Sequence, residues 1–244
     1  MRMTQARSIT QYTYQEMRAD LISCKLRPGS HLRTSELSRR FGTSLSAVRE
    51  ALSRLVSEQL VVADPQRGFR AAPMSSEDLY SLTETSMGIE AMCIRSALAH
   101  GDRDWEIQLA AARDAVLKAP LNTKKAPKRI SAPFANAHHA FHETLISACS
   151  NERTLALRKL HHDQSERYRQ LCIPYAPNDS LRSGYNEITA AAIARDAELT
   201  IKLVADQFSR NVDRFAEALD SEETVRFWID EDGGKGKTGL AAVG

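Results

Sequence analysis

Two histidines that stand four residues apart are the first candidates for chemistry in this chain. His138 and His142 fall in the segment Phe134–Cys149, whose apolar spacing predicts a helix, so their imidazoles share one helix face. That spacing suits two ligands of one divalent metal ion. His161 and His162 could complete a ligand set, but nothing in the spacing brings them to it. The pattern leaves open a metal site, a metal-free polar pocket, and histidines that only support packing.

Small polar and basic side chains gather near the start of another predicted helix. This helix begins near Ser44 or Ser46, either of which can cap it. Its apolar face holds Val48, Ala51, Leu52 and Leu55, and its polar face holds Ser46, Arg49, Glu50 and Ser53. A shorter helix precedes it over Ser35–Phe41, and Gly42 separates the two. Two helices joined by a short turn with glycine form a helix-turn-helix, whose second helix can enter the major groove of DNA.

Two short segments of strand composition follow this motif. Leu60–Ala63 and Gly68–Ala71 bracket the turn-forming residues Asp64–Gly68, which predicts a hairpin. An earlier helix has an apolar stripe that includes Met17 and Leu21, and it ends before a turn at 27–29. A hairpin directly after a helix-turn-helix forms a wing, so we expect a winged helix-turn-helix domain.

The charge of the chain is divided unevenly between its two ends. Residues 1–73 carry 12 Lys and Arg against 6 Asp and Glu, whereas the remaining residues carry 21 against 25. A small basic domain before a larger, mildly acidic one is expected if only the first meets a polyanion. The alternative is a solvated surface whose asymmetry arose by chance.

The rest of the chain predicts helices and no strands. Helical spacing continues to about Trp228, and glycine and proline interrupt it. The basic segment Lys124–Arg129 is expected to be an exposed loop. We therefore expect a mainly α protein with a winged helix-turn-helix domain at 1–73, a linker at 74–79, an all-helical bundle at 80–230 and a flexible tail at 231–244.

Composition limits the class of protein further. The chain has 244 residues, of which 42% are hydrophobic and 26% charged, as in ordinary globular domains. No apolar run reaches the roughly 18 residues that span a bilayer, and the N-terminus lacks the apolar core of a signal peptide. The four cysteines are too widely spaced for a zinc ribbon or a CxxC pair. We expect a cytoplasmic protein with reduced thiols and no membrane partner.

Several short motifs occur together between Leu26 and Phe69. They are Leu-Arg-Pro-Gly-Ser-His-Leu at 26–32, Phe-Gly-Thr-Ser at 41–44, Val-Arg-Glu-Ala-Leu at 48–52 and Arg-Gly-Phe at 67–69. Together they resemble the DNA-binding domain of GntR-family transcription regulators. The later residues Glu90, Phe141-His142, Asn151 and Ala194-Arg195-Asp196 are similar to landmarks of the FadR-type ligand-binding domain of that family, an all-helical bundle called FCD. The resemblance covers about residues 9 to 220.

The resemblance implies DNA contacts at eight positions. They are Arg33 and Ser35 at the second helix, Ser44, Leu45, Ser46 and Arg49 in the recognition helix, and Arg67 and Gly68 in the wing. The family usually carries Arg where this chain has Leu45 and Pro where it has Ala47. A missing arginine removes a guanine contact worth about 1 to 3 kcal/mol of discrimination. Leu45 can instead touch a thymine methyl group or pack inside, so the operator sequence does not transfer from the family.

The resemblance also implies an effector site in the second domain. Many FCD domains hold a metal ion with an Asp, a His and two more His from later helices, and the aligned positions here are His138, His142, Tyr185 and Gln207. Tyrosine and glutamine are poor ligands for a transition metal. No cofactor is therefore expected to be required. A divalent metal at His138 and His142 remains the alternative to a small organic acid or polar metabolite.

Together these features predict a ligand-responsive transcription regulator. We expect it to repress metabolic genes by binding a pseudo-palindromic operator in double-stranded DNA as a homodimer. A metal-dependent hydrolytic enzyme at His138 and His142 is one alternative, although the chain lacks a nearby acid–base motif such as HExxH. A winged helix that binds protein rather than DNA is the other.

Overall fold

The computed structural model describes residues 2–65, 67–123, 126–172 and 182–220, in two compact units. The first is built on the chain up to Ser75, and the second on Ser76–Ser165 and Cys172–Ala218. The described segments Glu166–Leu171 and 219–220 are assigned to the first unit. The flexible tail expected at 231–244 lies outside the described residues.

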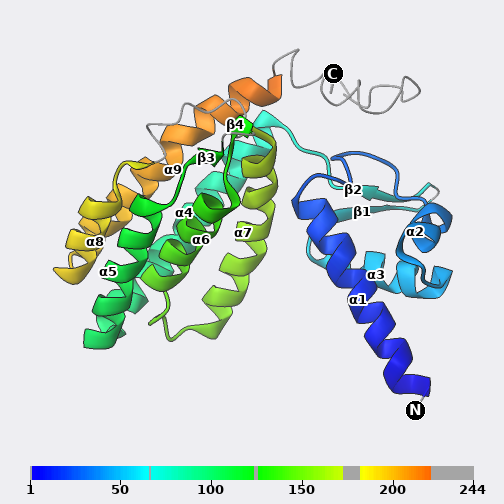
Figure 1. Cartoon of the computed structure of the whole chain (residues 1–244), viewed down its shortest axis with the longest axis horizontal. Helices are drawn as coiled ribbons and strands as arrows, with labels where there is room; N and C mark the ends of the chain where they lie inside the picture. The colour runs from blue at the N-terminus through cyan, green and yellow to red at the C-terminus, as the bar shows by residue number, and fades with distance from the viewer. Residues whose placement is uncertain (1, 66, 124–125, 173–181, 221–244) are drawn as a thin grey trace. The chain divides into compact units, whose positions relative to one another are not determined.

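The first unit is a three-helix domain with a hairpin (Figure 1). Its elements are α1 (Arg2–Ile22), α2 (Thr34–Phe41), α3 (Leu45–Ser57), β1 (Val61–Asp64) and β2 (Gly68–Ala71). Its core consists of Met17, Leu21, Leu32, Leu37, Val48, Ala51, Leu52, Leu55, Leu60, Val61 and Ala71. The buried residues of α3 recur every three or four positions, which places them on the face that packs on α1 and α2. The expected helix-turn-helix is confirmed.

The turn between α2 and α3 has a local chemical cause. Gly42 ends α2 in the left-handed conformation, at φ 60°, which glycine adopts at little cost. Ser44 then caps α3, because its hydroxyl accepts a hydrogen bond of 3.2 Å from the backbone N–H of Ala47. The first turn of α3 is therefore fixed by residues within the motif itself.

The expected wing is also present. β1 and β2 pair antiparallel, with Val61 opposite Ala71 and Asp64 opposite Gly68. The turn places Gly68 at φ 87°, where a residue with a side chain would be strained. A hydrogen bond of 3.1 Å from the Arg67 N–H to the Asp64 carbonyl closes it.

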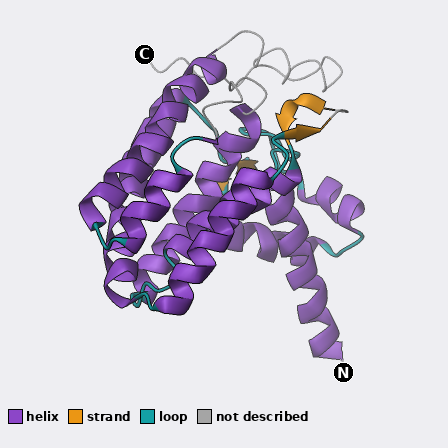
Figure 2. Cartoon of the chain, turned by 60° about the vertical axis from the view of Figure 1, so that its left-hand side comes forward, coloured by secondary structure: helices purple, strands orange, loops and turns teal. Residues whose placement is uncertain are grey.

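The second unit is a bundle of helices (Figure 2). They are α4 (Ser76–His100), α5 (Arg103–Lys118), α6 (Ala132–Leu145), α7 (Glu152–Cys172), α8 (Tyr185–Ile193) and α9 (Ala197–Asp220). α4 begins inside the segment 74–79 that the sequence predicts as a linker. The core of the bundle includes Cys93, Ile94, Trp105, Leu109, Val116, Phe134, Phe141, Leu145, Tyr185, Ile188 and Val204. None of the described helices is both long and apolar enough to cross a membrane.

The expectation that this unit contains no strands is wrong. β3 (Asn122–Thr123) and β4 (Ala126–Ile130) form a short antiparallel hairpin between α5 and α6, and β4 overlaps the segment Lys124–Arg129 that was expected to be an exposed loop. Pro127 lacks the N–H of a regular strand residue, and only a short pairing forms, so the segment carries no strand-like alternation. A hydrogen bond of 2.8 Å from the Ser131 N–H to the Leu121 carbonyl closes the base of the hairpin.

A buried ion pair joins three helices of the second unit. The Arg158 side chain on α7 hydrogen-bonds to the carboxylates of Glu90 on α4 and Glu143 on α6. Arg158 and Glu90 have less than a tenth of their side chains exposed, whereas Glu143 is about half exposed. Burial lowers the pKa of Arg158, but the two carboxylates outweigh it and raise that pKa overall. The guanidinium therefore stays charged inside the bundle.

Candidate nucleic-acid interface

The first turn of α3 presents polar and apolar groups to solvent. Ser44, Leu45, Ser46 and Arg49 are all exposed, while Ala47 and Val48 between them are buried. The hydroxyls of Ser44 and Ser46 lie 3.0 Å apart. Leu45 is 49% exposed, which excludes the interpretation that it packs inside.

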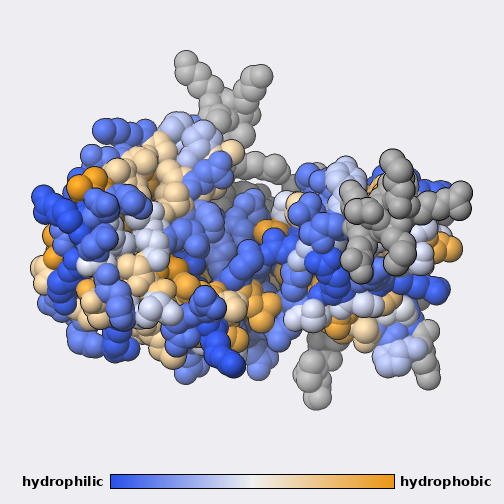
Figure 3. Space-filling model, turned by 90° about the horizontal axis from the view of Figure 1, so that it is seen from below, coloured by the Kyte–Doolittle hydropathy of each residue, from blue (hydrophilic) through white to orange (hydrophobic). Residues whose placement is uncertain are grey.

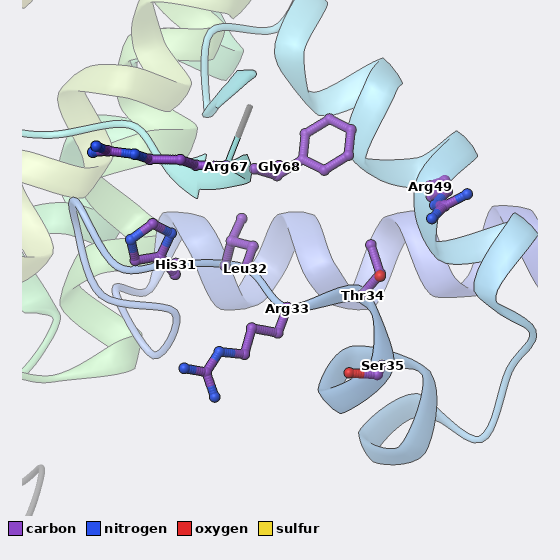
Figure 4. A pocket seen from close by; sticks show the side chains of 9 residues that line it. His31, Leu32, Arg33, Thr34, Ser35, Arg49, Arg67 and Gly68 are labelled. Atoms are coloured by element: carbon purple, nitrogen blue, oxygen red, sulfur yellow. The ribbon is translucent and has the colours of Figure 1, made fainter. Parts of the chain in front are cut away.

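A concavity of about 550 Å³ lies beside α3 in the first unit (Figure 4). Nine residues line it: His31, Leu32, Arg33, Thr34, Ser35, Arg49, Arg67, Gly68 and Phe69. Five of them belong to the predicted DNA-binding set, and they come from three separate elements: the start of α2, α3 and the wing. Ser44, Leu45 and Ser46 do not line the concavity but occupy the first turn of the same α3.

The concavity carries positive charge that is largely available to a ligand. None of its lining residues is acidic. The Arg33 guanidinium pairs with Glu36 at 3.0 Å, but both side chains are more than half exposed. Among the described residues no carboxylate lies within ion-pair distance of Arg49 or Arg67. Exposed guanidinium groups around one hollow can take up phosphate oxygens or guanine edges.

Two polar residues of the concavity are absent from the predicted set, His31 and Thr34. Both stand close to predicted residues in the sequence, His31 two positions before Arg33 and Thr34 between Arg33 and Ser35. The sequence feature that could have identified these two residues is their position in the motif that leads into α2. What the sequence does not show is that this segment folds back onto β2, where His31 forms a β-bridge with Arg70.

The structure brings three of the predicted effector residues into direct contact in the second unit. The Nδ1 atom of His138 lies 2.7 Å from the hydroxyl of Tyr185, and the rings of His138 and His142 have centroids 4.7 Å apart. Phe141 contacts both His142 and Tyr185 edge to face. His142 and Tyr185 are buried, whereas His138 is half-buried. α6 and the first residue of α8 thus build a polar cluster inside an aromatic shell.

Gln207 of α9 contacts the segment that leads into Tyr185. The neighbouring Phe208 contacts the ring of His142, with centroids 5.5 Å apart. The Gln207 side chain is buried, and its amide nitrogen donates a hydrogen bond of 3.0 Å to the Ser183 carbonyl, just before α8 begins. Gln207 therefore holds the start of α8 that carries Tyr185.

The donor chemistry of this cluster does not fit a transition metal. One imidazole of the pair already bonds to a phenol, and the remaining aligned side chain is a carboxamide. The Nε2 atom of His162, one of the replacements considered from the sequence, lies 3.1 Å from Nδ1 of His139. Among the described residues no group of three or more His, Cys, Asp and Glu side chains is arranged to hold a metal ion.

Comparison with known proteins gives two family matches along the chain. Residues 9–70 match the model of the bacterial regulatory proteins of the gntR family, and residues 81–210 match the FCD domain. The first match contains the concavity and the wing, and the second contains the polar cluster.

Whole-chain relatives agree with this division. The chain is 34% identical over 199 residues to the HTH-type transcriptional regulator BphR of Paraburkholderia xenovorans (strain LB400), which covers 81% of each chain. It is 29% identical over 196 residues to the HTH-type transcriptional repressor GlaR of Escherichia coli (strain K12), which covers 78% of this chain and 88% of the relative. The solved structure of McbR/YncC from E. coli shares the fold, with a TM-score of 0.68 at 18% identity over 86% of this chain and 97% of that one.

Proposed function

Because this chain belongs to the gntR family of bacterial regulatory proteins and carries an FCD domain, we propose that it is a homodimeric repressor controlled by a small organic acid or polar metabolite. It is a DNA-binding transcription regulator, and its family and relatives are regulators rather than enzymes. The metal-dependent hydrolase suggested by the histidine pair is therefore set aside.

The proposed mode of DNA binding is based on the concavity, which is lined by Arg33, Arg49 and Arg67. We place the first turn of α3 in the major groove, where Arg49 contacts a base edge or a phosphate. Arg67 at the tip of the wing then contacts the backbone or the neighbouring groove. Guanidinium groups from three elements fix the orientation of the domain on the duplex, since each is held by a different part of the fold.

The limited size of this interface supports the proposal of a homodimer. One winged helix offers few phosphate contacts, whereas a two-fold dimer doubles them and binds a pseudo-palindrome. The recognition helix and wing must stay free for DNA, so we place the dimer contacts in the helical unit. Several large apolar side chains are exposed there: Tyr80, Met92, Ile107, Leu157, Ile193 and Leu199. Figure 3 shows apolar residues scattered among polar ones over the face seen there. Light scattering at micromolar protein should give the mass of a dimer, and a monomer with and without DNA would overturn this part.

The effector site is the cluster of His138, His142, Tyr185 and Gln207. Imidazole, phenol and carboxamide groups all donate hydrogen bonds, and an anion would favour protonated imidazole. A metal ion would have only two good ligands there, and two ligands rarely bind a metal ion tightly enough to retain it when the protein is diluted. We therefore assign an organic anion or polar metabolite, and no required cofactor. Such a ligand controls DNA binding if it prefers one arrangement of the dimer over another.

Thermal melting of the purified protein tests the effector site. A panel of organic acids should contain one that, at about 100 times its dissociation constant, stabilises the protein by about 2.7 kcal/mol, a shift of roughly 5 to 11 °C in Tm. The His138→Gln variant should lose this shift, while Arg153→Ala on the exposed surface of α7 should keep it. One stoichiometric metal per chain in elemental analysis, lost in His138→Ala, would overturn the metal-free assignment.

Anisotropy titrations test the DNA interface. A duplex selected from a random pool on the full-length protein serves as the probe. Arg49→Ala should weaken binding by about 1 to 3 kcal/mol. Arg153→Ala removes the same charge from an exposed helix of the other unit and should bind as wild type does. Equal affinity of Arg49→Ala and wild type would refute the recognition-helix assignment. Affinity that does not change with salt would favour the protein-interaction alternative.

The repressor role is supported by the name of one relative, the HTH-type transcriptional repressor GlaR. A dimer that is bound at a promoter blocks RNA polymerase sterically. In vitro transcription from a promoter carrying the selected site should fall as the protein is added and recover with the effector. A rise in transcript on adding the protein alone would make it an activator.

A further inference from the structure

We propose that His31 binds a DNA phosphate as a protonated imidazole, so that DNA binding takes up protons and weakens as the pH rises. This inference rests on the proposed DNA-binding function. It adds a contact from His31 to those that we assign to the arginines of the interface. Histidine is the side chain whose charge ordinarily changes between pH 5 and 8. Its place in the interface therefore decides whether affinity depends on pH in that range.

The backbone around His31 is held rigidly against the wing. His31 forms a β-bridge with Arg70 of β2, and the neighbouring Leu32 N–H donates a hydrogen bond of 2.8 Å to the Phe69 carbonyl. On the other side, the Ser30 carbonyl accepts a bond of 3.0 Å from the Ala71 N–H. The segment thus acts as a short third edge of the hairpin, and His31 is presented from a fixed point rather than from a mobile loop.

The side chain of His31 is exposed and shares the concavity with the basic residues of the interface. Figure 4 shows it on the segment that leads into α2, across from Arg67 of the wing. It therefore stands between the wing and the start of α2, beside the groups that we assign to the DNA backbone. A phosphate held by Arg33 or Arg67 comes within reach of the imidazole.

The charged side chains that line the concavity with His31 are all arginines. Arg33 comes from the start of α2, Arg49 from α3 and Arg67 from the wing, while Arg70 lies across the β-bridge on β2. The acidic residues of these elements are Glu36 on α2, Glu50 on α3 and Asp64 on β1, and none of them lines the concavity. Glu36 lies 3.0 Å from Arg33. No lining carboxylate competes for the imidazole. A DNA phosphate would supply the negative charge, and a negative neighbour favours the protonated form.

Linkage then sets the sign of the effect. If the bound state holds more protons than the free state, affinity falls as the pH rises. A dimer carries two such groups, so up to two protons are taken up. We expect the dissociation constant of the wild type to rise severalfold between pH 6.0 and pH 8.0, the range in which histidine side chains change charge.

The test is an anisotropy titration of full-length protein at pH 6.0, 7.0 and 8.0. Ionic strength is fixed, because salt alone shifts affinity. The probes are the selected duplex and a scrambled duplex of the same composition. His31→Gln should bind as weakly at pH 6.0 as wild type does at pH 8.0, and His31→Arg should bind tightly at every pH. The matched control is His100→Gln, another exposed histidine at the end of α4, which should keep the wild-type pH dependence.

Each outcome decides the proposal. Loss of pH dependence in His31→Gln on both duplexes supports a phosphate contact, since phosphates carry no sequence information. Loss on the selected duplex alone would assign His31 to a base edge and overturn the phosphate contact. A wild-type pH profile in His31→Gln would overturn the proposal outright. Arg49→Ala separates this failure from that of the DNA interface: if it weakens binding while His31→Gln changes nothing, only the His31 contact is wrong.

Discussion

Leu45 offers a direct test of how this protein distinguishes bases. It is the first residue of α3, at the end of the helix assigned to the major groove, and it is 49% exposed. Leucine cannot donate a hydrogen bond, so its base contact must be apolar. The one apolar group that the major groove offers is the methyl of thymine. We predict that Leu45 contacts a thymine methyl in each half-site.

The size of the effect follows from the area of one methyl group. Burying a carbon of this kind is worth about 0.8 kcal/mol, and a dimer makes the contact twice, which gives about 1.6 kcal/mol. Replacing the contacted thymines with deoxyuridine removes the methyl groups and leaves the hydrogen-bonding edge unchanged. The dissociation constant should therefore rise roughly 15-fold when both half-sites are changed.

A double-mutant cycle assigns this loss to Leu45. Deoxyuridine is placed at one thymine position of the selected duplex at a time, symmetrically in both half-sites, and each duplex is titrated with wild type and Leu45→Ala. At the contacted position, the variant should bind the thymine and deoxyuridine duplexes equally, because the partner of the methyl is gone. Val62→Ala serves as the control, since it removes another exposed apolar side chain from the same unit.

Two results would refute this reasoning. If no deoxyuridine substitution weakens wild-type binding, no thymine methyl is read. If a substitution weakens wild type and Leu45→Ala by the same factor, another residue reads the methyl and Leu45 is not a base contact.

The winged helix was predictable from the sequence because its determinants are local. Gly42 and Ser44 end one helix and cap the next through bonds within a few residues, and the apolar repeat of α3 selects its buried face. The hairpin is likewise specified by its own turn residues. The resemblance to the family, rather than the local pattern alone, proposed Arg49 and Arg67 as DNA contacts, and both side chains line the concavity.

The concavity itself was not predictable in this way. It depends on residues 30–32 returning to β2, which pairs positions about 40 residues apart in the chain. A segment of three residues is too short to show a periodic pattern that would predict this pairing. His31 and Thr34 were missed for that reason, although they stand within two positions of residues that were predicted.

The polar cluster of the second unit shows the same limit. Helical spacing placed His138 and His142 on one face, but the contact between His138 and Tyr185 joins residues from two helices. The resemblance to FCD domains proposed that grouping, whereas spacing alone left three interpretations open. The β3–β4 hairpin was missed because Pro127 and a short pairing leave no alternating pattern.

Two further predictions concern the buried ion pair of the helical unit. Arg158→Met leaves the Glu90 carboxylate buried without its guanidinium, so urea unfolding should lose about 3 to 5 kcal/mol, whereas Arg153→Met on the exposed face of α7 should lose almost nothing. Burial alone raises the pKa of the Glu143 carboxyl, but the hydrogen bond and charge of Arg158 outweigh it and hold that pKa below its ordinary value of 4.5. Because the folded pKa is the lower one, the stability that Glu143 contributes is complete above pH about 4.5 and is lost as the pH falls through the folded value. Unfolding free energies of wild type and Glu143→Gln, measured from pH 7 to pH 3, should therefore converge at the acidic end, and a difference that stays constant would show that Glu143 does not hold the charged form in the folded protein.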